Sequence, residues 1–487
     1  MPDQQLIARG TPQGRWVLTA AVLGSGMAMI DGTVVNIALR SVGNSLGASI
    51  AELQWVVNAY LLALASLILV GGSLGDHFGR RRVFMIGVTW FAVASALCGV
   101  AQTPVQLIIA RLVQGIGAAL LTPGSLAMIQ GSFRARDRGR VIGQWAGLGG
   151  IAAALGPLLG GWIIDNASWR WIFLINVPVA VVVLLVAGRH VPESRDPEAA
   201  RDFDVVGAVL GVIGLGGATY ALIEAGSAPR SYVTVAGVLG VACLGAFVVA
   251  ERRLHDPLVP MHLFRSRTFS VANLMTLLVY GALGAMLFFL VLQLQVSTGF
   301  TPLQAGISTI PLTLVMLLFS SRSGALASRV GPRLPLSLGP VLCGAGVLLL
   351  RQIGAGTNYF TGVLPGLLVF SSGLVLLVAP LTSSVLAAAP DRFAGIASGI
   401  NNAIARTGSL LAVAALPAIV GITGKDYQSP QVFTAGYAQA MLISAVLLVG
   451  GGVVSFVGLA GVRADRLAPA PTPAPDPAAA PDPTSDP

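Results

Sequence analysis

The sequence predicts an all-α polytopic membrane protein that crosses the bilayer about fourteen times. Its composition is 55% apolar and only 10% charged, whereas soluble domains have roughly 25% charged residues. Apolar runs of the roughly 20 residues needed to cross a hydrocarbon core about 30 Å thick recur along the chain. These runs do not alternate as barrel strands do, and in lipid a helix is the other way to satisfy backbone hydrogen bonds.

The apolar runs divide the chain into two groups of six spans separated by a pair of extra spans. The expected N-terminal half, residues 1–189, contains spans at 16–38, 52–72, 83–102, 105–128, 140–162 and 171–189. In the linker region, 190–267, charged segments at 190–204 and 251–267 flank spans at 205–225 and 231–250. The C-terminal half, 268–462, contains spans at 268–293, 302–321, 334–351, 358–380, 394–421 and 436–460. A Pro/Ala-rich tail, 463–487, is expected to be disordered.

Basic residues are distributed unequally between the two sides that this span order defines. Twenty-two Arg residues fall on the side of the termini, against five basic residues on the other side. Because cytoplasmic loops are rich in Lys and Arg, we expect an inner (plasma) membrane protein with both termini in the cytoplasm. The net charge of +9 is spread over many short loops, which argues against nucleic acid as a partner. We expect a monomer in the lipid bilayer.

An internal repeat indicates that the two halves are related. Residues 72–81 read GSLGDHFGRR and residues 324–333 read GALASRVGPR. Residues 136–143, RDRGRVIG, are matched by residues 392–399, RFAGIASG, and a proline precedes each of these segments at a comparable place, Pro123 and Pro380. Matches in the same order at nearly one offset predict two parallel repeats around a central cavity.

The loop between the second and third spans combines an acid with an arginine cluster in a glycine-rich turn. An acid in this position can pair with Arg side chains, or with the positive N-terminal end of a helix, of the other half. Such a contact would be a conformational lock that is broken during alternating access. The alternative is an ordinary basic cytoplasmic loop, which explains the arginines but not the acid or the glycines. The residues of the lock are Gly72, Asp76, Gly79, Arg80 and Arg81.

The fifth span carries several glycines around one proline. Glycines let a neighbouring backbone approach closely, and a proline removes a helix hydrogen bond and permits a kink. General packing of small residues is the alternative interpretation. The residues are Gly147, Gly156, Pro157, Gly160 and Gly161.

Asp31 is the one acid predicted to lie well inside a span, and Arg111 is predicted at a similar depth in another. The two side chains are therefore expected to interact. Burial disfavours the charged form of the acid and the arginine favours it, so a change in water access can load or release a proton. We expect Asp31, with Arg111, to carry the coupling proton. Arg406 is predicted near the midplane, and for both arginines the alternative is a structural role that satisfies backbone carbonyls.

Other polar side chains within or near the spans are candidates for the cavity or for structural contacts. Glu52 and Glu224 lie near the outer helix ends, where an interfacial position is the preferred interpretation. The histidines and cysteines show no metal-ligand spacing, so neither a metal nor a cofactor is expected besides the coupling proton. The remaining candidates are Asn36, Asn58, Gln114, Trp145 and Asn401.

The motifs taken together resemble the major facilitator superfamily, and more closely its fourteen-span drug:proton antiporters of the EmrB/QacA type. The segments that carry the resemblance are the 72–81 loop and residues 31–39, 111–117, 147–161, 169–178, 397–399 and 406–408. Arg40 departs from the pattern, since this family usually has proline there. The resemblance implies a major facilitator fold, and it associates the fifth-span motif with exporters.

We therefore predict a proton-coupled secondary transporter, and not an enzyme, that exports small lipophilic compounds such as drugs or antibiotics. Gradient-driven uptake of a nutrient is one alternative, and a membrane sensor without transport is another. ATP-driven transport is excluded, because a phosphate-binding loop needs Gly-Lys-Ser/Thr and the single lysine, Lys425, is followed by Asp426. The substrate is expected to be neutral or monocationic.

Overall fold

The computed structural model describes residues 6–195, 204–390 and 393–460, and within α12 only the backbone of residues 321, 324, 325, 327 and 328. Fourteen described helical segments are long and apolar enough to cross a membrane, which confirms the predicted number of spans. The predicted tail, 463–487, lies outside the described residues, as do residues 196–203 of the first linker.

The helices of the first half are α1 (Pro12–Leu46), α2 (Ile50–Phe78), α3 (Arg80–Val100), α4 (Pro104–Ser132), α5 (Ala135–Asn166), α6 (Trp171–Leu174) and α7 (Asn176–His190). The extra pair is α8 (Val205–Ile223) and α9 (Arg230–Arg253). The second half consists of α10 (Arg267–Val296), α11 (Pro302–Ser308), α12 (Ile310–Val330), α13 (Arg333–Leu350), α14 (Leu364–Ala387), α15 (Ala394–Ile419) and α16 (Pro430–Gly458).

Helix α1 is longer than its apolar run predicts. Thr11 caps its start and Pro12 occupies the first turn, where proline is tolerated because its missing N–H would be unpaired. The helix continues past the predicted end at residue 38 and stops at Gly47, whose φ of 66° favours glycine. Arg40 therefore lies inside the helix and not in an outer loop. Its side chain donates a hydrogen bond to the Gln295 carbonyl of α10. The extra turns of α1 are thus tied to the other half.

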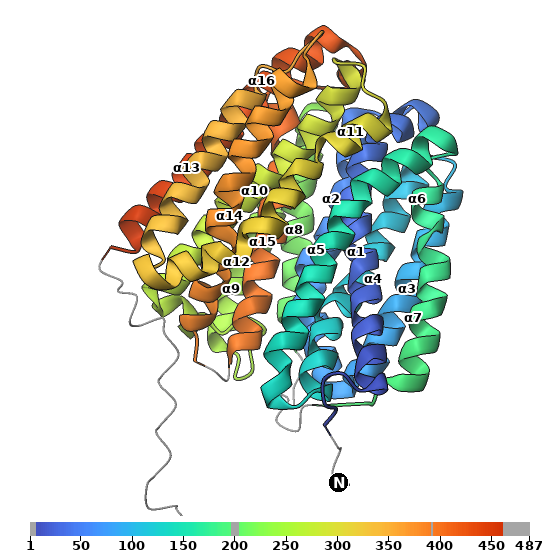
Figure 1. Cartoon of the computed structure of the whole chain (residues 1–487). Coiled ribbons are helices and arrows are strands. Elements are labelled where there is room, and N and C mark those ends of the chain that lie inside the picture. Colours follow the sequence, from blue (N-terminus) through green and yellow to red (C-terminus); the bar gives the residue numbers. More distant parts are fainter. Residues whose placement is uncertain (1–5, 196–203, 391–392, 461–487) are drawn as a thin grey trace, which may run out of the picture.

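Figure 1 shows α1–α7 and α10–α16 as two groups of helices side by side. We call the end of the bundle where α1 begins the terminal face, and the other end the opposite face. Neighbouring helix ends mark the terminal face in both halves. Gln13 of α1 donates to the His190 carbonyl at the end of α7, and Arg333 of α13 donates to the Phe456 carbonyl in the last turn of α16.

Backbone features recur at equivalent places in the two halves. Gly79 follows α2 with φ 111°, and Gly331 follows α12 with φ 79°, a region that side chains other than glycine rarely adopt. Pro123 lies inside α4, and Pro380 lies inside α14. The repeated sequence segments therefore form the same local turns and bends.

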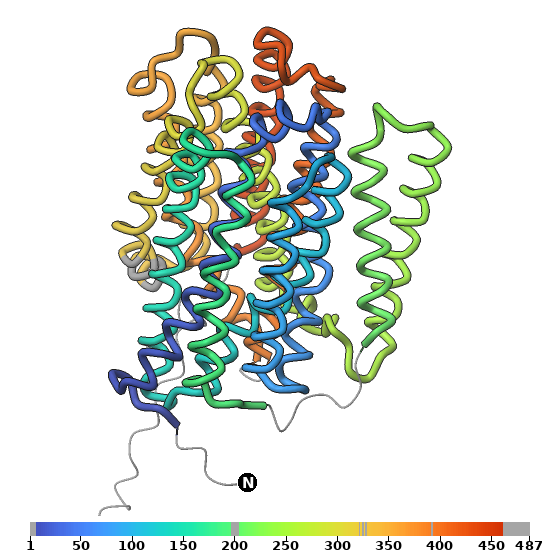
Figure 2. Tube along the Cα trace, turned by 90° about the vertical axis from the view of Figure 1, so that its right-hand side faces the viewer, coloured from blue at the N-terminus to red at the C-terminus, as the bar shows by residue number. Residues whose placement is uncertain are grey.

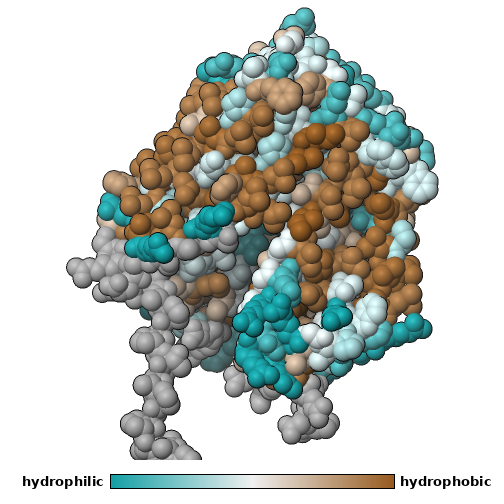
Figure 3. All heavy atoms as spheres, viewed as in Figure 1, coloured by the Kyte–Doolittle hydropathy of each residue, from teal (hydrophilic) through white to brown (hydrophobic). Residues whose placement is uncertain are grey.

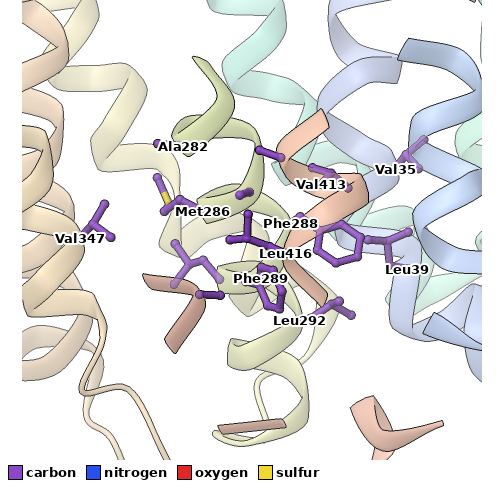
Figure 4. Close-up of a cluster of buried hydrophobic side chains, with 14 of the residues drawn as sticks. Val35, Leu39, Ala282, Met286, Phe288, Phe289, Leu292, Val347, Val413 and Leu416 are labelled. Atoms are coloured by element: carbon purple, nitrogen blue, oxygen red, sulfur yellow. The ribbon is translucent and has the colours of Figure 1, made fainter. Parts of the chain in front are cut away.

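A large apolar cluster joins the two halves. Val35 and Leu39 of α1 lie beside Phe288 of α10, which Figure 4 shows directed toward Leu39. Val413 of α15 belongs to the same cluster, and these four side chains are at most 2% exposed. Burial of side chains of this size contributes roughly 1.5–3 kcal/mol each in water, whereas between lipid-embedded helices close packing supplies the attraction.

Helices α8 and α9 stand at the side of the bundle (Figure 2). Helix α8 contacts α2 of the first half and α15 of the second, whereas α9 packs mainly on α8. Only 6% of the membrane-crossing window of α9 is buried inside the protein, so most of its surface is available to lipid. Figure 3 shows a broad hydrophobic band across the visible face, with hydrophilic residues gathered at both ends.

Candidate transport site

Asp31 of α1 and Arg111 of α4 form a buried ion pair, as their similar depth predicted. The Arg111 Nη1 lies 2.5 Å from the Asp31 Oδ2, and the two residues are 1% and 0% exposed respectively. The guanidinium also lies 4.3 Å from the ring centroid of Tyr60 and donates through Nε to the Val56 carbonyl. The arginine is thus fixed by α2 as well as by the acid.

Gln114, one turn after Arg111 on α4, completes the pair. Its amide donates to the Asp31 Oδ1 at 2.9 Å, and its carbonyl oxygen accepts from the Arg111 Nη1 at 2.7 Å. The same amide donates to the Ser95 hydroxyl of α3, which also accepts from Asn176 of α7. Four helices therefore contribute to one buried polar network.

Both oxygens of the Asp31 side chain are hydrogen-bonded in this network. Each oxygen accepts from a donor, Oδ1 from Gln114 and Oδ2 from Arg111. Arg111 and Gln114 therefore fix the position of the Asp31 carboxyl group from the side of α4.

A second polar site lies in the other half, around Arg406 of α15. A cavity of about 170 Å³ is bounded there by α10, α14 and α15. Tyr280, Thr382, Asn401, Asn402 and Ser409 contribute polar groups to its wall. Arg406 is half-buried, and among the described residues its guanidinium has no hydrogen-bond or ion-pair partner. The alternative prediction for Arg406, that it donates hydrogen bonds to backbone carbonyls, is therefore not realised in this structure.

The halves are held together at the opposite face. Gln54 of α2 donates to the carbonyls of Val413 and Ala414 of α15, and the Tyr427 hydroxyl donates to the Ala48 carbonyl. Gln295 of α10 donates to the Ile37 carbonyl of α1. Every hydrogen bond between α1–α7 and the second half that involves described residues lies toward this face. The cavity around Arg406 lies in the terminal half of α15, so this conformation is closed at the opposite face.

The fifth-span motif forms part of this closure. A side-chain carbon on Gly161 would lie 2.6 Å from the Leu303 Cα of α11, and one on Gly306 of α11 would overlap the Pro157 carbonyl. Gly156 and Gly160 instead leave room for the side chains of Thr33 and Val34 of α1. At the end of α5, the Asp165 carboxylate accepts a hydrogen bond from the Thr301 hydroxyl. The expectation for Gly147 is wrong, because a side-chain carbon there would meet nothing within 4 Å.

The proposed lock lies at the terminal face. Asp76 pairs with Arg80 of its own loop at 2.8 Å, so in this conformation it is not paired across the halves. Gly79 leaves room for the Glu193 carboxylate, which accepts from the backbone N–H groups of Arg81 and Arg82. Gly72 lies close to Pro123 of α4. The loop is therefore bound to the segment that follows α7.

The remaining predicted candidates are dispersed. Glu52 caps α2 through Ser49, and Glu224 ends α8 and accepts from Trp55, so both acids lie at helix ends. Trp145 donates to Ser25. Asn36 is half-buried, and Asn58 is 0% exposed with neither amide atom bonded to a described residue.

Several polar residues of functional interest escape prediction from the sequence. Ser95 lies within an apolar run, and Gln295 lies two residues beyond the span predicted at 268–293. Asn176 belongs to the 169–178 segment, but nothing in the sequence shows which way its side chain faces. Glu251 was assigned to a basic linker, but it lies in the last turn of α9 and is 2% exposed. The missing side chain of Gly207 leaves room for the carboxyl groups of both Glu251 and Asp204.

Comparison with known proteins agrees with this architecture. The profile of the Major Facilitator Superfamily matches residues 21–413. The chain is 34% identical over 420 residues to the tetracenomycin C resistance and export protein of Streptomyces glaucescens, covering 84% of this chain and 76% of that protein. It is 35% identical over 438 residues to the methylenomycin A resistance protein of Bacillus subtilis, covering 89% and 92%. It is 36% identical over 427 residues to the puromycin resistance protein pur8 of Streptomyces alboniger, covering 85% and 84%.

Solved structures share the fold at low sequence identity. A bacterial homologue of the human drug peptide transporters PepT1 and PepT2 superposes with a TM-score of 0.66 at 14% identity, covering 92% of this chain and 98% of that one. A bacterial homologue of the human lysosomal transporter Spinster gives 0.65 at 16% identity, covering 94% and 98%.

Two related helical halves, each with a polar site inside it, are the architecture of a secondary transporter. This chain belongs to the major facilitator superfamily. Within the superfamily it is a transporter of the drug-efflux class and not an enzyme, in agreement with the sequence prediction.

Proposed function

We propose that this protein exports small lipophilic compounds in exchange for protons, and that Asp31 is the residue that carries the proton. The observation behind this proposal is the buried Asp31, whose two oxygens are both occupied by donors from α4. In the proposed cycle, protonation of Asp31 removes the charge that pairs with Arg111, and loss of the proton restores the pair. Relatives named for tetracenomycin C, methylenomycin A and puromycin support an antibiotic-like substrate.

The conformation supports one step of the proposed transport cycle, in which the site is reached from the terminal face. The opposite face is closed, and Asp31 is paired with Arg111 and Gln114. If the terminal face is cytoplasmic, this is the state in which the proton has been released inside and a substrate can enter from inside. The basic residues support that orientation, since twenty-two Arg residues lie on the terminal side. A reporter fused after residue 195 should therefore stay in the cytoplasm of cells that express the protein in their plasma membrane, and an external reporter would contradict this orientation.

The function is tested with purified protein in vesicles under an imposed pH gradient, with puromycin as the probe. Wild-type protein should release protons when puromycin is added and should move puromycin against its gradient. Asp31→Asn fixes a neutral side chain in the same space, so it should insert and bind the probe but lose proton-driven transport. Asp256→Asn, which changes an exposed acid of the second linker, is the matched control. Proton-driven efflux at the wild-type rate by Asp31→Asn would contradict the assignment of Asp31.

A further inference from the structure

The spans of this protein contain more positive than negative charge. More than five residues from either helix end, the described Asp, Glu, Lys and Arg side chains are Asp31, Arg40, Arg111, Arg322 and Arg406. Arg40 donates to the Gln295 carbonyl and Arg322 to the Leu318 carbonyl. Asp31 and Arg111 neutralise each other at 2.5 Å. Among these five, Arg406 is the one whose charged group has neither a hydrogen-bond nor an ion-pair partner among the described residues. A cation inside a membrane protein is costly unless a partner or water solvates it.

The walls around Arg406 do not supply that partner. The Ser409 hydroxyl donates to the Tyr280 carbonyl, and the Thr382 hydroxyl donates to the Val378 carbonyl. The Asn402 amide donates to the Ser398 carbonyl. The Ser409, Thr382 and Asn402 side chains thus donate to backbone carbonyls of their own helices or of α10. The donors of the wall without a partner among the described residues are the Arg406 guanidinium and the hydroxyl groups of Tyr280 and Ser398.

The Asn401 side chain is hydrogen-bonded to α10 and not to Arg406. Its amide donates to Asn273 at 3.0 Å and to Thr276 at 2.8 Å, both on α10. These two residues share one face of α10 with Tyr280, which lines the cavity. The side of the cavity toward α10 is thus rigidly hydrogen-bonded, while Arg406 points into about 170 Å³ of space.

The remaining wall is apolar. Val385 and Leu386 of α14 and Ala405 of α15 line the same cavity. A ligand that satisfies this site has an acidic group at one end and an apolar body. A guanidinium forms paired hydrogen bonds with planar oxyanions such as carboxylates, and charge-assisted bonds of this kind are about twice as strong as neutral ones.

We propose that Arg406 is the recognition site for an ionised acidic group, a carboxylate, phenolate or sulfonate, on lipophilic substrates of this transporter. The proposal rests on the export function above and specifies its substrate class. It adds lipophilic acids to the neutral or monocationic substrates expected from the sequence, because the one acid among the mid-span charges is already bound to Arg111 whereas Arg406 is not paired.

The test uses two fluorescent probes with the same aromatic body, anilinonaphthalene sulfonate and the uncharged phenyl-naphthylamine. Binding is titrated on purified protein in detergent, without any gradient. Wild-type protein should bind the sulfonate at least about tenfold more tightly than the uncharged probe, as expected for a desolvated charge-assisted pair. Arg406→Gln should remove that preference and leave the affinity for the uncharged probe within about twofold, while Arg406→Lys should retain part of it.

Arg230→Gln, which removes an exposed arginine at the start of α9, is the control and should bind both probes like the wild type. Equal affinity of the wild type for the two probes, or loss of both probes in Arg406→Gln with unchanged thermal stability, would overturn the proposal. Because no gradient is used, a protein that prefers the sulfonate but does not transport it would refute the export function and leave this recognition site intact.

Discussion

Gly306 of α11 lies directly against the carbonyl of Pro157 of α5, and these two residues belong to different halves of the molecule. Gly161, one turn further along α5, receives Leu303 of α11 in the same way. The fifth-span motif is thus a backbone-to-backbone contact between halves at the closed face, which gives its glycines a specific role in this conformation.

Gly306→Ala and Gly161→Ala should therefore disfavour closure of the opposite face. The added carbon overlaps backbone atoms that cannot rotate away, which costs about 1–3 kcal/mol in this conformation. Distances between spin labels at the opposite-face ends of α5 and α10 should shift toward a wider separation. Gly147→Ala adds a carbon to open space and should leave the distances unchanged. Equal behaviour of all three variants would show that the contact does not control closure.

Gln114→Leu should impair coupling while the substrate still binds. The change removes the donor to the Asp31 Oδ1 and the acceptor of Arg111, and it leaves buried groups unpaired at a cost of about 1–3 kcal/mol. Thermal stability and gradient-driven transport should both fall, and probe binding at Arg406 should not. Gln106→Leu changes an exposed glutamine on the same helix and serves as the control. Unaltered stability would mean that the network is dispensable.

Asp76→Asn should slow transport with little effect on stability. The pair with Arg80 is partly exposed and lies within one loop, and such pairs contribute at most about 1 kcal/mol. If Asp76 changes partner when the terminal face closes, the loss appears in the transport rate and not in the unfolding of this conformation. Vesicle transport and thermal unfolding of Asp76→Asn and of Asp256→Asn separate the two effects. If Asp76→Asn transported at the wild-type rate, the loop would determine only the orientation of the protein in the membrane.

Glu251→Gln should stabilise the protein at mildly alkaline pH. The Glu251 Oε2 accepts from the Val259 N–H, while its Oε1 and the Asp204 Oδ2 have no donor among the described residues. One shared proton can satisfy both oxygens, so raising the pH leaves two buried like charges and destabilises the wild type by about 1 kcal/mol. Glutamine supplies a permanent donor and removes one charge.

The matched variant is Asp204→Asn, which also caps α8 and should remove the same pH dependence. Unfolding temperatures measured from mildly acidic to mildly alkaline pH test both. A wild-type protein whose unfolding temperature does not fall across this range would contradict a shared proton.

The sequence predicted the fourteen spans because lipid demands long apolar helices, and this demand is readable without any tertiary information. It also predicted the pairing of Asp31 with Arg111, since an acid and a base at similar depth have few other partners in lipid. The predicted end of the first span at residue 38 was nevertheless wrong, because α1 extends to Leu46.

The rest of the site depends on which side of each helix faces inward. In a soluble helix a polar face marks the outside, but here both lipid and the protein interior accept apolar residues. The sequence therefore does not predict that the side chains of Ser95 and Gln295 face the protein interior. Likewise, Glu251 was placed in a linker because its neighbours Arg252 and Arg253 are basic. Only the packing of α8 against α9 reveals that its carboxyl group is enclosed.

The position of α8 has a consequence for the route by which compounds dissolved in the bilayer reach the protein. The two halves meet the surrounding lipid along two seams, one between α2 and α15 and the other between α5 and α11–α12. Helix α8 lies across the first seam and contacts both of its walls, so a lipophilic molecule arriving there from the side meets a further helix. The described helices place no such cover over the second seam. A molecule entering sideways from the membrane would therefore find an uncovered seam among the described helices only beside α5, the helix whose glycines close the opposite face.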